Sequence, residues 1–290
     1  MTQSMQDEAH RFGDALAAYL KPHRHALKDY AWPMSAKART TARALGLAVG
    51  DTDGGALATQ QLRQAVAQRV REIHRLSGPE RDAGMEALCG FVIRVWGGLA
   101  SNRDETIAAY SSFFLDACPP DLSDIASAMQ LRSHARCDFP FKGISSWSKW
   151  LNFVWNDWAL IYDARIAFAL NAIHFREGVD ARAFRVPEGR DALLSKIDTQ
   201  SLAGLRYLKR RGEQAPGLDS HNRDLVRWME SALMPEEKTY EYYLLVMQRA
   251  REVLDQDGAC SLVDTEMLLF YLSNREVVRD LLDTVGTAVA

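Results

Sequence analysis

The spacing of apolar residues along the chain predicts a protein built mainly from α-helices. The segment 59–77 is the clearest case, because its apolar residues recur every three or four positions with arginine and glutamine between them: Leu62, Val66, Val70 and Ile73. This spacing places them on one face of a helix. Thr59 is the expected N-cap residue of this helix, and Ser77-Gly78-Pro79 is its expected stop.

Further helices follow from the same kind of pattern, whereas alternation of apolar and polar residues typical of strands is scarce. We expect these helices near residues 82–98, 104–115, 122–132, 239–254 and 264–272. Turn-forming residues predict loops over 50–55, 174–190 and 212–223. The expected fold class is therefore mainly α, with two helical lobes around one cleft.

The composition is that of a globular protein. The chain has 290 residues, of which 47% are hydrophobic and 25% are charged, so it can bury a sizeable core. No apolar run reaches the roughly 18 residues that a membrane span needs. The first residues are polar and acidic, which is not the pattern of a secretory signal. We therefore expect a cytoplasmic protein without a membrane partner.

The charge is unevenly distributed along the chain. The net charge of −3 at pH 7 is a mild argument against nucleic-acid binding. However, residues 21–43 carry six Lys or Arg against one acidic residue, and residues 206–211 carry four. One interpretation is a basic face on an acidic protein, and the other is solvated charge scattered over the surface.

The sequence lacks the motifs of metal and nucleotide chemistry. The four cysteines are at least 19 residues apart, so we expect buried thiols rather than a zinc or iron–sulfur site. The histidines show no metal-ligand spacing beyond His23-x-His25, which is more typical of a surface loop. No phosphate loop, dinucleotide fingerprint or nucleophile elbow occurs. We expect neither a metal nor an organic cofactor.

Residues 139–173 are the most informative part of the chain. Four of the seven tryptophans lie within the twelve positions 147–158. A buried helix accounts for most of the aromatic and apolar residues here, because several of them recur at helical spacing: Trp147, Leu151, Val154 and Trp158. We expect a turn over 139–144, a helix from about Ser146, and a second helix opened by Asp163. The N–H groups at such a helix start are able to bind a phosphate.

This segment resembles the helix-hairpin-helix DNA glycosylase superfamily, in which a Gly-apolar-Gly hairpin precedes an apolar helix and a catalytic aspartate opens the next helix. Gly143-Ile144 is similar to the start of the hairpin, and Asp163 is similar to the catalytic aspartate. The surrounding residues are also similar to a bacterial group with the 8-oxoguanine glycosylase fold. The resemblance implies a glycosylase region over 81–290, with its hairpin and catalytic helix at 139–173, behind an N-terminal helical region over 1–80.

Two positions depart from the family pattern. Ser145 stands where the second hairpin glycine is expected, which puts the shape of the phosphate-binding turn in doubt. Trp147 stands where bifunctional members carry the lysine that forms a Schiff base, and Lys149 lies about 200° further around the helix. Monofunctional members of the alkyl-adenine type also carry Gly-Ile-x-x-Trp here. The resemblance therefore implies a monofunctional enzyme, which does not cut the strand.

The resemblance implies a role for each residue around the hairpin. Asp163 is the expected catalytic residue, because an ionised carboxylate stabilises positive charge on the sugar and activates a water. The aromatic residues expected to contact a flipped base are Trp147, Trp150 and Tyr162. The groups expected to bind the DNA backbone are Lys142, Gly143, Ser146, Ser148, Lys149 and Arg165. The implied partner is double-stranded DNA, and the implied base is either host damage or a hypermodified base of phage DNA, excised in antiviral defence.

The same residues also have structural interpretations. Aspartate is a common N-cap residue, and Asp163 can combine capping with catalysis. Tryptophans at helical spacing are typical of a core, and Arg165 is also typical of a solvated helix face. One alternative for the whole chain is a non-enzymatic all-helical protein that keeps the glycosylase scaffold for binding DNA or protein. A second alternative is a plain helical interaction module.

Overall fold

Helices account for nearly all the regular structure of this protein. The computed structural model describes residues 3–50, 54–117, 140–189, 194–217, 221–255 and 260–289. Within these ranges, pairing between extended segments is limited to two isolated bridges, Ala31 with Gly55 and Ala183 with Leu233. The expected mainly α fold class is therefore confirmed for the described part of the chain.

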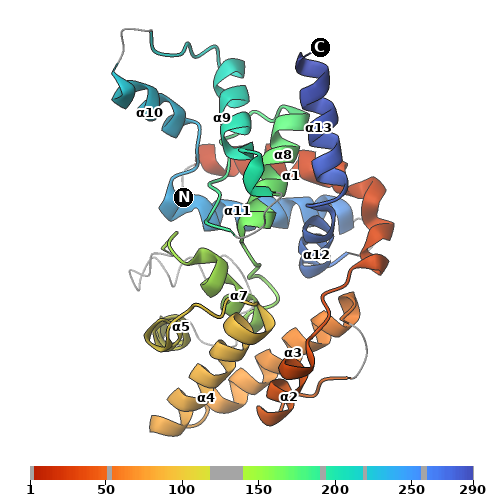
Figure 1. The fold of residues 1–290 in the computed structure, drawn as a ribbon, viewed down its shortest axis with the longest axis vertical. Helices are drawn as coiled ribbons and strands as arrows, with labels where there is room; N and C mark the ends of the chain where they lie inside the picture. Colours follow the sequence, from red (N-terminus) through yellow and green to blue (C-terminus); the bar gives the residue numbers. More distant parts are fainter. Residues whose placement is uncertain are drawn as a thin grey trace. The chain divides into compact units, whose positions relative to one another are not determined.

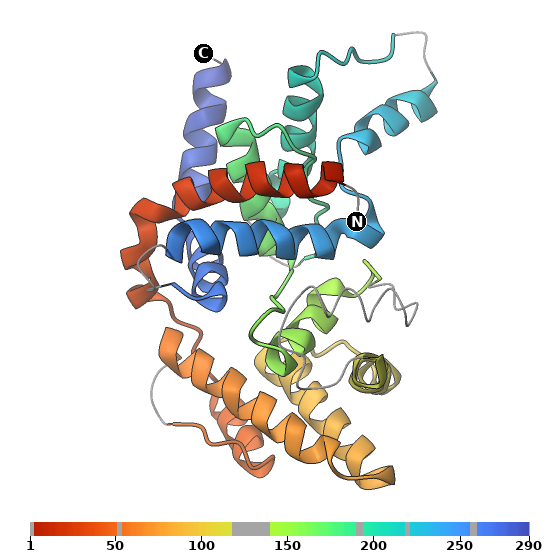
Figure 2. The ribbon, with the colours of Figure 1, turned by 180° about the vertical axis from the view of Figure 1, so that it is seen from behind.

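Figure 1 labels the α-helices in chain order, and Figure 2 shows the same ribbon from behind. The α-helices are α1 (Gln3–Leu20), α2 (Ala36–Ala44), α3 (Ala56–His74), α4 (Gly78–Gly90), α5 (Asp104–Ala117), α7 (Ile144–Val154), α8 (Ala164–Glu177), α9 (Thr199–Arg210), α10 (Asn222–Ser231), α11 (Glu236–Leu254), α12 (Leu262–Leu272) and α13 (Glu276–Val289). The other helical turns are the 3-10 helices η1 (Lys21–Asp29) and η3 (Leu194–Lys196) and the π-helix η2 (Phe91–Trp96). None of the helices in the described ranges combines the length and apolar character needed to cross a membrane.

The strongly periodic segments fold as predicted. The helices expected over 59–77, 82–98, 104–115, 239–254 and 264–272 correspond to α3, α4 with η2, α5, α11 and α12. The predicted apolar face of α3 is buried, and Val66 and Val70 are wholly inaccessible to solvent. The helix expected near 122–132 lies outside the described residues.

Two helix limits differ from the prediction. Thr59 is not the N-cap residue of α3, because the helix begins directly after Gly55 and Thr59 is buried within it. The loop expected over 174–190 begins later, because α8 continues to Glu177. That helix ends where Gly178 adopts the left-handed region with a φ of 60°. Glycine occupies this conformation without a steric penalty and commonly ends helices.

The helices of this chain are divided between two compact units. The first unit comprises Met1–Leu27, Pro140–Lys142 and Tyr162–Ala290. The second unit comprises Lys28–Phe139 and Gly143–Ile161. Neither unit has a limit near residue 80, where the sequence placed the end of an N-terminal region.

In the first unit, α8 lies at the centre of the helix packing. It contacts α1, α9, α12 and α13, and α1 runs alongside α11 (Figure 2). The nine consecutive residues from Ile166 to His174 are buried, as expected of a helix surrounded by others. The buried Asn171 amide also fixes the chain that follows α8. It donates to the Phe184 carbonyl and accepts from the Phe184 N–H, both at 2.8 Å.

In the second unit, α7 has a comparable position. It contacts α3, α5 and η2, and every residue of α7 after Ser145 is buried. Trp96 at the end of η2 packs edge-on against Phe153, with ring centroids 4.7 Å apart. Gly97, the next residue, also lies close to α7, because a Cβ at that position would lie 2.9 Å from the Lys149 side chain. The sequence 139–173 thus supplies the central helices of both units.

Candidate functional site

The turn before α7 has a backbone conformation that favours glycine. Gly143 lies in the left-handed region, with φ 78° and ψ 8°, immediately before α7 begins at Ile144. Its carbonyl accepts hydrogen bonds from the N–H groups of Ser146 and Trp147 at 2.8 and 3.1 Å. No side chain in the described part of the chain caps this helix start. The turn and helix start expected at Gly143 are therefore present.

Two residues that the sequence analysis missed contact this turn. The Tyr110 hydroxyl lies so close to Gly143 that a Cβ there would overlap it. Burial raises the pKa of this tyrosine. Asn102 and Ser146 exchange two side-chain hydrogen bonds, at 3.2 and 3.3 Å. Asn102 stands 44 residues before Ser146, so no local pattern in the sequence connects the two.

The aromatic residues expected to contact a base are buried. Trp147 and Trp150 in α7, and Tyr162 just before α8, are each 0% exposed. The Tyr162 hydroxyl donates to the Arg185 carbonyl at 2.6 Å, and its ring centroid lies 5.0 Å from that of Tyr243. Burial raises the pKa of Tyr162 well above its usual value. Base contact by these three side chains stays a prediction, and it requires them to become accessible.

The residues expected to bind the DNA backbone differ in their exposure. Lys142 and Gly143 are exposed, so a phosphate can reach them without rearrangement. Ser146, Ser148 and Lys149 are buried. The Lys149 ammonium donates at 2.8 Å to a backbone carbonyl in the first turn of its own helix. Phosphate contact by the three buried side chains stays a prediction, and it requires a change in conformation.

Asp163 is the N-cap residue of α8. Its Oδ1 accepts hydrogen bonds from the backbone N–H groups of Arg165 and Ile166, both at 3.1 Å. The backbone of Asp163 is extended, as is usual for an N-cap residue. The residue is half-buried and is therefore not sealed from solvent. Both the N–H donors and the helix dipole favour negative charge at this position.

Arg165 lies in the first turn of the helix that Asp163 caps. Its guanidinium carbon is 4.6 Å from the centre of the Phe270 ring in α12, which is within the range of a cation–π interaction. The side chain is half-buried. This stacking links the start of α8 to α12 within the first unit, and phosphate binding by Arg165 stays a prediction.

A pocket of about 380 Å³ adjoins the start of α8. Ala164, the residue after Asp163, lines it together with Phe168, which lies one turn further along the helix. The remaining lining comes from residues within 186–189 and 194–199 and is mostly apolar, with the hydroxyl groups of Ser195 and Thr199 and the Asp198 carboxylate. This volume falls at the low end of the range for small-molecule sites. The described lining contains no Lys or Arg, so it does not form a basic rim.

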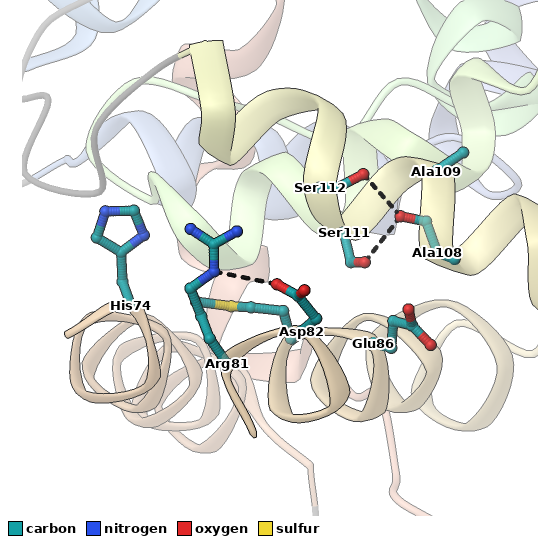
Figure 3. A pocket seen from close by; sticks show the side chains of 9 residues that line it. His74, Arg81, Asp82, Glu86, Ala108, Ala109, Ser111 and Ser112 are labelled. Carbon is teal, nitrogen blue, oxygen red and sulfur yellow. Dashed lines mark hydrogen bonds and ion pairs between the residues drawn. The ribbon is translucent and has the colours of Figure 1, made fainter. Parts of the chain in front are cut away.

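The second unit contains another pocket, of about 370 Å³, which none of the predicted site residues lines. Figure 3 shows His74, Arg81, Asp82 and Glu86 on one wall and the small side chains of α5, including Ser111, on the other. Arg81 donates to Asp82 at 3.1 Å. Because side chains of both charge signs line this pocket, it has no evident preference for an anion or a cation.

No three His, Cys, Asp or Glu side chains of the described ranges are grouped as a metal site would require. Cys89 and Cys260 are buried thiols, as expected. Burial raises the pKa of both, which makes them poor thiolate nucleophiles. The other two cysteines, Cys118 and Cys137, lie outside the described residues.

Comparisons of this chain with protein-family models, with curated proteins and with solved structures find no match. What the protein does must therefore be inferred from its own residues.

Proposed function

We propose that the protein is a monofunctional DNA glycosylase that hydrolyses the bond between a damaged or modified base and its deoxyribose. The observation that carries the proposal is the Asp163 carboxylate. It is half-buried and fixed at the start of α8 by the N–H groups of Arg165 and Ile166. It also occupies the position at which residues 139–173 resemble the catalytic aspartate of helix-hairpin-helix glycosylases.

The reaction explains why a fixed carboxylate is needed. As the glycosidic bond breaks, the base departs with the bonding electrons and positive charge develops on the sugar. A carboxylate beside the sugar stabilises this charge and accepts a proton from the water whose oxygen bonds to C1′. The departing base takes up a proton, and an abasic site remains. The strand stays intact, because Trp147 occupies the position of the Schiff-base lysine.

The pocket beside Ala164 supports the proposal. A base inside a duplex cannot reach a protein carboxylate, so glycosylases extrude the nucleotide into a pocket. Asp163 is not among the residues that line the pocket, but Ala164, the next residue in the chain, is. The lining is mostly apolar, which suits a planar base. Its hydroxyl groups supply hydrogen-bonding partners for a polar edge. We propose that this pocket admits part of the extruded nucleotide.

Base release is the measurement that tests this function. The full chain is incubated with duplexes that each contain one modified base, from a host-damage panel and from a panel of phage-type modified cytosines. We expect free base, detected by mass spectrometry, and an abasic site that breaks only after alkaline treatment. Release from the phage-type panel alone would favour a defence enzyme over a repair enzyme. No release from either panel would contradict the proposal.

Two variants control for loss of folding. Asp163→Asn removes the negative charge but keeps an oxygen that caps the helix, because asparagine is as good an N-cap residue as aspartate. Asp264→Asn alters another acidic residue at a helix start, in the capping box of α12. We expect Asp163→Asn to abolish base release and Asp264→Asn to retain it.

A second candidate function is a binding protein that uses the same scaffold without catalysis. The complete burial of Trp147, Trp150 and Tyr162 favours it, because these side chains then serve packing alone. This candidate predicts that the protein binds modified DNA and that Asp163→Asn binds it equally well. Neither protein would release base.

A further inference from the structure

Five exposed cations of the first unit lie on α9, directly after it and on α10, two helices that contact one another. Both views show α10 lying beyond α9 (Figure 1, Figure 2). The cations are Lys209, Arg210 and Arg211 at the end of α9 and Arg223 and Arg227 on α10. We call these five residues the α9–α10 cationic surface. It contains three of the four cations that the sequence placed at 206–211.

Most of this charge is available to a partner. Arg211 and Arg227 have exposed acidic neighbours, Glu213 at 3.7 Å and Asp224 at 3.4 Å. Exposed pairs of this kind contribute little and exchange readily with solvent. The three other cations, Lys209, Arg210 and Arg223, form no ion pair with a described residue.

Helix stability explains only part of this surface. Cations in the last turn of a helix interact favourably with its dipole, which accounts for Lys209 and Arg210 in α9. Arg223 is the second residue of α10, where the dipole disfavours a cation. The helix dipole therefore does not account for the cation at this position.

The packing of α10 leaves its outer face without a partner among the described residues. None of its residues is buried, and the helix is held through the half-buried Trp228 and Met229, which pack against a small cluster in which α9 contributes Tyr207. Leu225 and Val226, between the two arginines, are 46% and 59% exposed. Substitutions on this face therefore leave the core intact.

We propose that the α9–α10 cationic surface binds the phosphate backbone of duplex DNA. The choice of duplex DNA rests on the proposed function, and the charge of the surface is complementary to a polyanion. An anionic membrane is a poorer partner. A membrane-bound helix needs a continuous apolar face, whereas α10 directs Trp228 and Met229 inward and exposes only two aliphatic side chains.

The salt dependence of DNA binding tests this proposal. The probe is an unmodified, fluorescently labelled duplex, and its affinity for the full chain is measured by anisotropy over a range of salt concentrations. The test variant is Lys209→Gln/Arg223→Gln. The matched control is Arg275→Gln/Arg279→Gln, which removes two exposed cations of the first unit, Arg275 in the turn before α13 and Arg279 within α13. Both variants change the net charge by the same amount.

We expect the test variant to bind about tenfold more weakly than wild type at 0.1 M salt. Its slope of log K against log salt should be shallower by about two, since each lost phosphate contact removes about one unit. The control should keep the wild-type slope. Equal affinities and slopes for all three proteins would overturn the proposal. The proposal would also be overturned if the test variant bound the duplex as wild type does but no longer bound phosphatidylserine vesicles.

Failure of this proposal and failure of the proposed function give different results. Binding of an unmodified duplex needs no chemistry, so the Asp163→Asn protein should show the same salt slope as wild type. A protein that releases base but is insensitive to Lys209→Gln/Arg223→Gln would refute only the surface. A protein that binds through this surface but releases no base would refute only the enzymatic function.

Discussion

Asp163 caps α8 and is also the proposed catalytic group. Substitution by asparagine distinguishes these two roles. As the N-cap residue of α8 it needs only an oxygen that accepts from the N–H groups of Arg165 and Ile166. As the proposed catalytic group it needs negative charge. Asparagine supplies the first and lacks the second, whereas alanine lacks both. The stability of the protein therefore depends on the oxygen that caps α8, whereas the proposed reaction depends on the negative charge.

We predict that Asp163→Ala lowers the free energy of unfolding by about 1 kcal/mol and that Asp163→Asn changes it by less than about 0.5 kcal/mol. Urea denaturation of the three proteins measures the difference. Equal losses in both variants would show that the capping hydrogen bonds do not account for the contribution of this side chain.

Gly143 combines a left-handed backbone with a close neighbour. We predict that Gly143→Ala costs more than the 1–2 kcal/mol or so that this backbone conformation alone imposes, because its Cβ would also meet the Tyr110 hydroxyl. Gly98→Ala is the control, since Gly98 has a φ of 68° and open space around it. Adding Tyr110→Phe should recover part of the loss for Gly143→Ala and none for Gly98→Ala. If Gly143→Ala lowers the free energy of unfolding no more than Gly98→Ala does, the close contact between Gly143 and the Tyr110 hydroxyl is contradicted.

From the sequence, the local features of the candidate site were predictable, but the burial of its side chains was not. The cap at Asp163 was predictable, because N-cap chemistry involves only the next three residues. The accessibility of Trp150 and Ser148 was not predictable. Periodicity indicates one apolar face of α7, but contacts with α3, α5 and η2 bury that helix on nearly every side. How many neighbours surround a helix is a tertiary property.

At the scale of elements, α8 organises the first unit through polar groups as well as apolar ones. The buried Asn171 amide satisfies both backbone groups of Phe184, and the buried His174 imidazole bonds to the Ala181 carbonyl at 2.5 Å. Both contacts fix the chain that leaves α8. Because this chain continues into the pocket lining at Val186, Pro187 and Gly189, we expect the loss of either contact to affect the pocket as well as stability.

We predict that Asn171→Leu lowers the free energy of unfolding by about 2–4 kcal/mol, since it leaves a buried N–H and a buried carbonyl of Phe184 without their partner. Asn152→Leu is the comparison. Asn152 is also buried, but it makes a single hydrogen bond, to the Ala159 carbonyl at 2.7 Å. Chemical denaturation should give the larger loss for Asn171→Leu. An equal loss of unfolding free energy in Asn152→Leu would argue against the two hydrogen bonds between Asn171 and the Phe184 backbone.

The buried His174 makes stability depend on pH. Burial lowers its pKa from 6.5 to about 4, and the hydrogen bond to the Ala181 carbonyl opposes this shift only in part. The unfolded state therefore binds more protons between these two values, and stability falls as the pH drops from about 6.5 towards 4. We predict that this histidine accounts for about 3 kcal/mol of the loss. His174→Gln should show a flatter profile in urea denaturation from pH 7 to pH 4, and an unchanged profile would contradict the prediction.

Elements with strong periodicity were predictable, and elements defined by tertiary packing were not. The residues of α3 and α11 carry their apolar stripe in the sequence itself. By contrast, α10 was not predicted, although Leu225, Val226, Trp228 and Met229 recur in it at helical spacing, and none of its residues is buried. The helix ends depended on single residues. As predicted, α3 ends before Ser77-Gly78-Pro79, but the same three residues also start α4, which begins at Gly78 with Pro79 in its first turn. Proline at that position favours a helix start because its missing N–H would have no partner there.

At the scale of the molecule, the limits of the two units could not be inferred from the sequence. The first unit joins Met1–Leu27 to residues beyond Tyr162, because α1 packs along α11. Contacts between segments more than 200 residues apart leave no local pattern. The uneven charge was visible in the sequence, whereas its arrangement on α9 and α10 became clear only from the structure. The proposed binding of DNA depends on where the cations of this chain lie and not on its net charge of −3.

The proposed function requires that the negative charge of Asp163 drives cleavage of a glycosidic bond. The decisive measurement is the single-turnover rate of base release by Asp163→Asn, on a duplex from which the wild-type protein releases base. We predict a loss of at least a hundredfold, since a general base contributes about 10²–10⁴-fold, while the salt slope for duplex binding stays that of wild type. Release at a rate within about threefold of wild type would contradict the account.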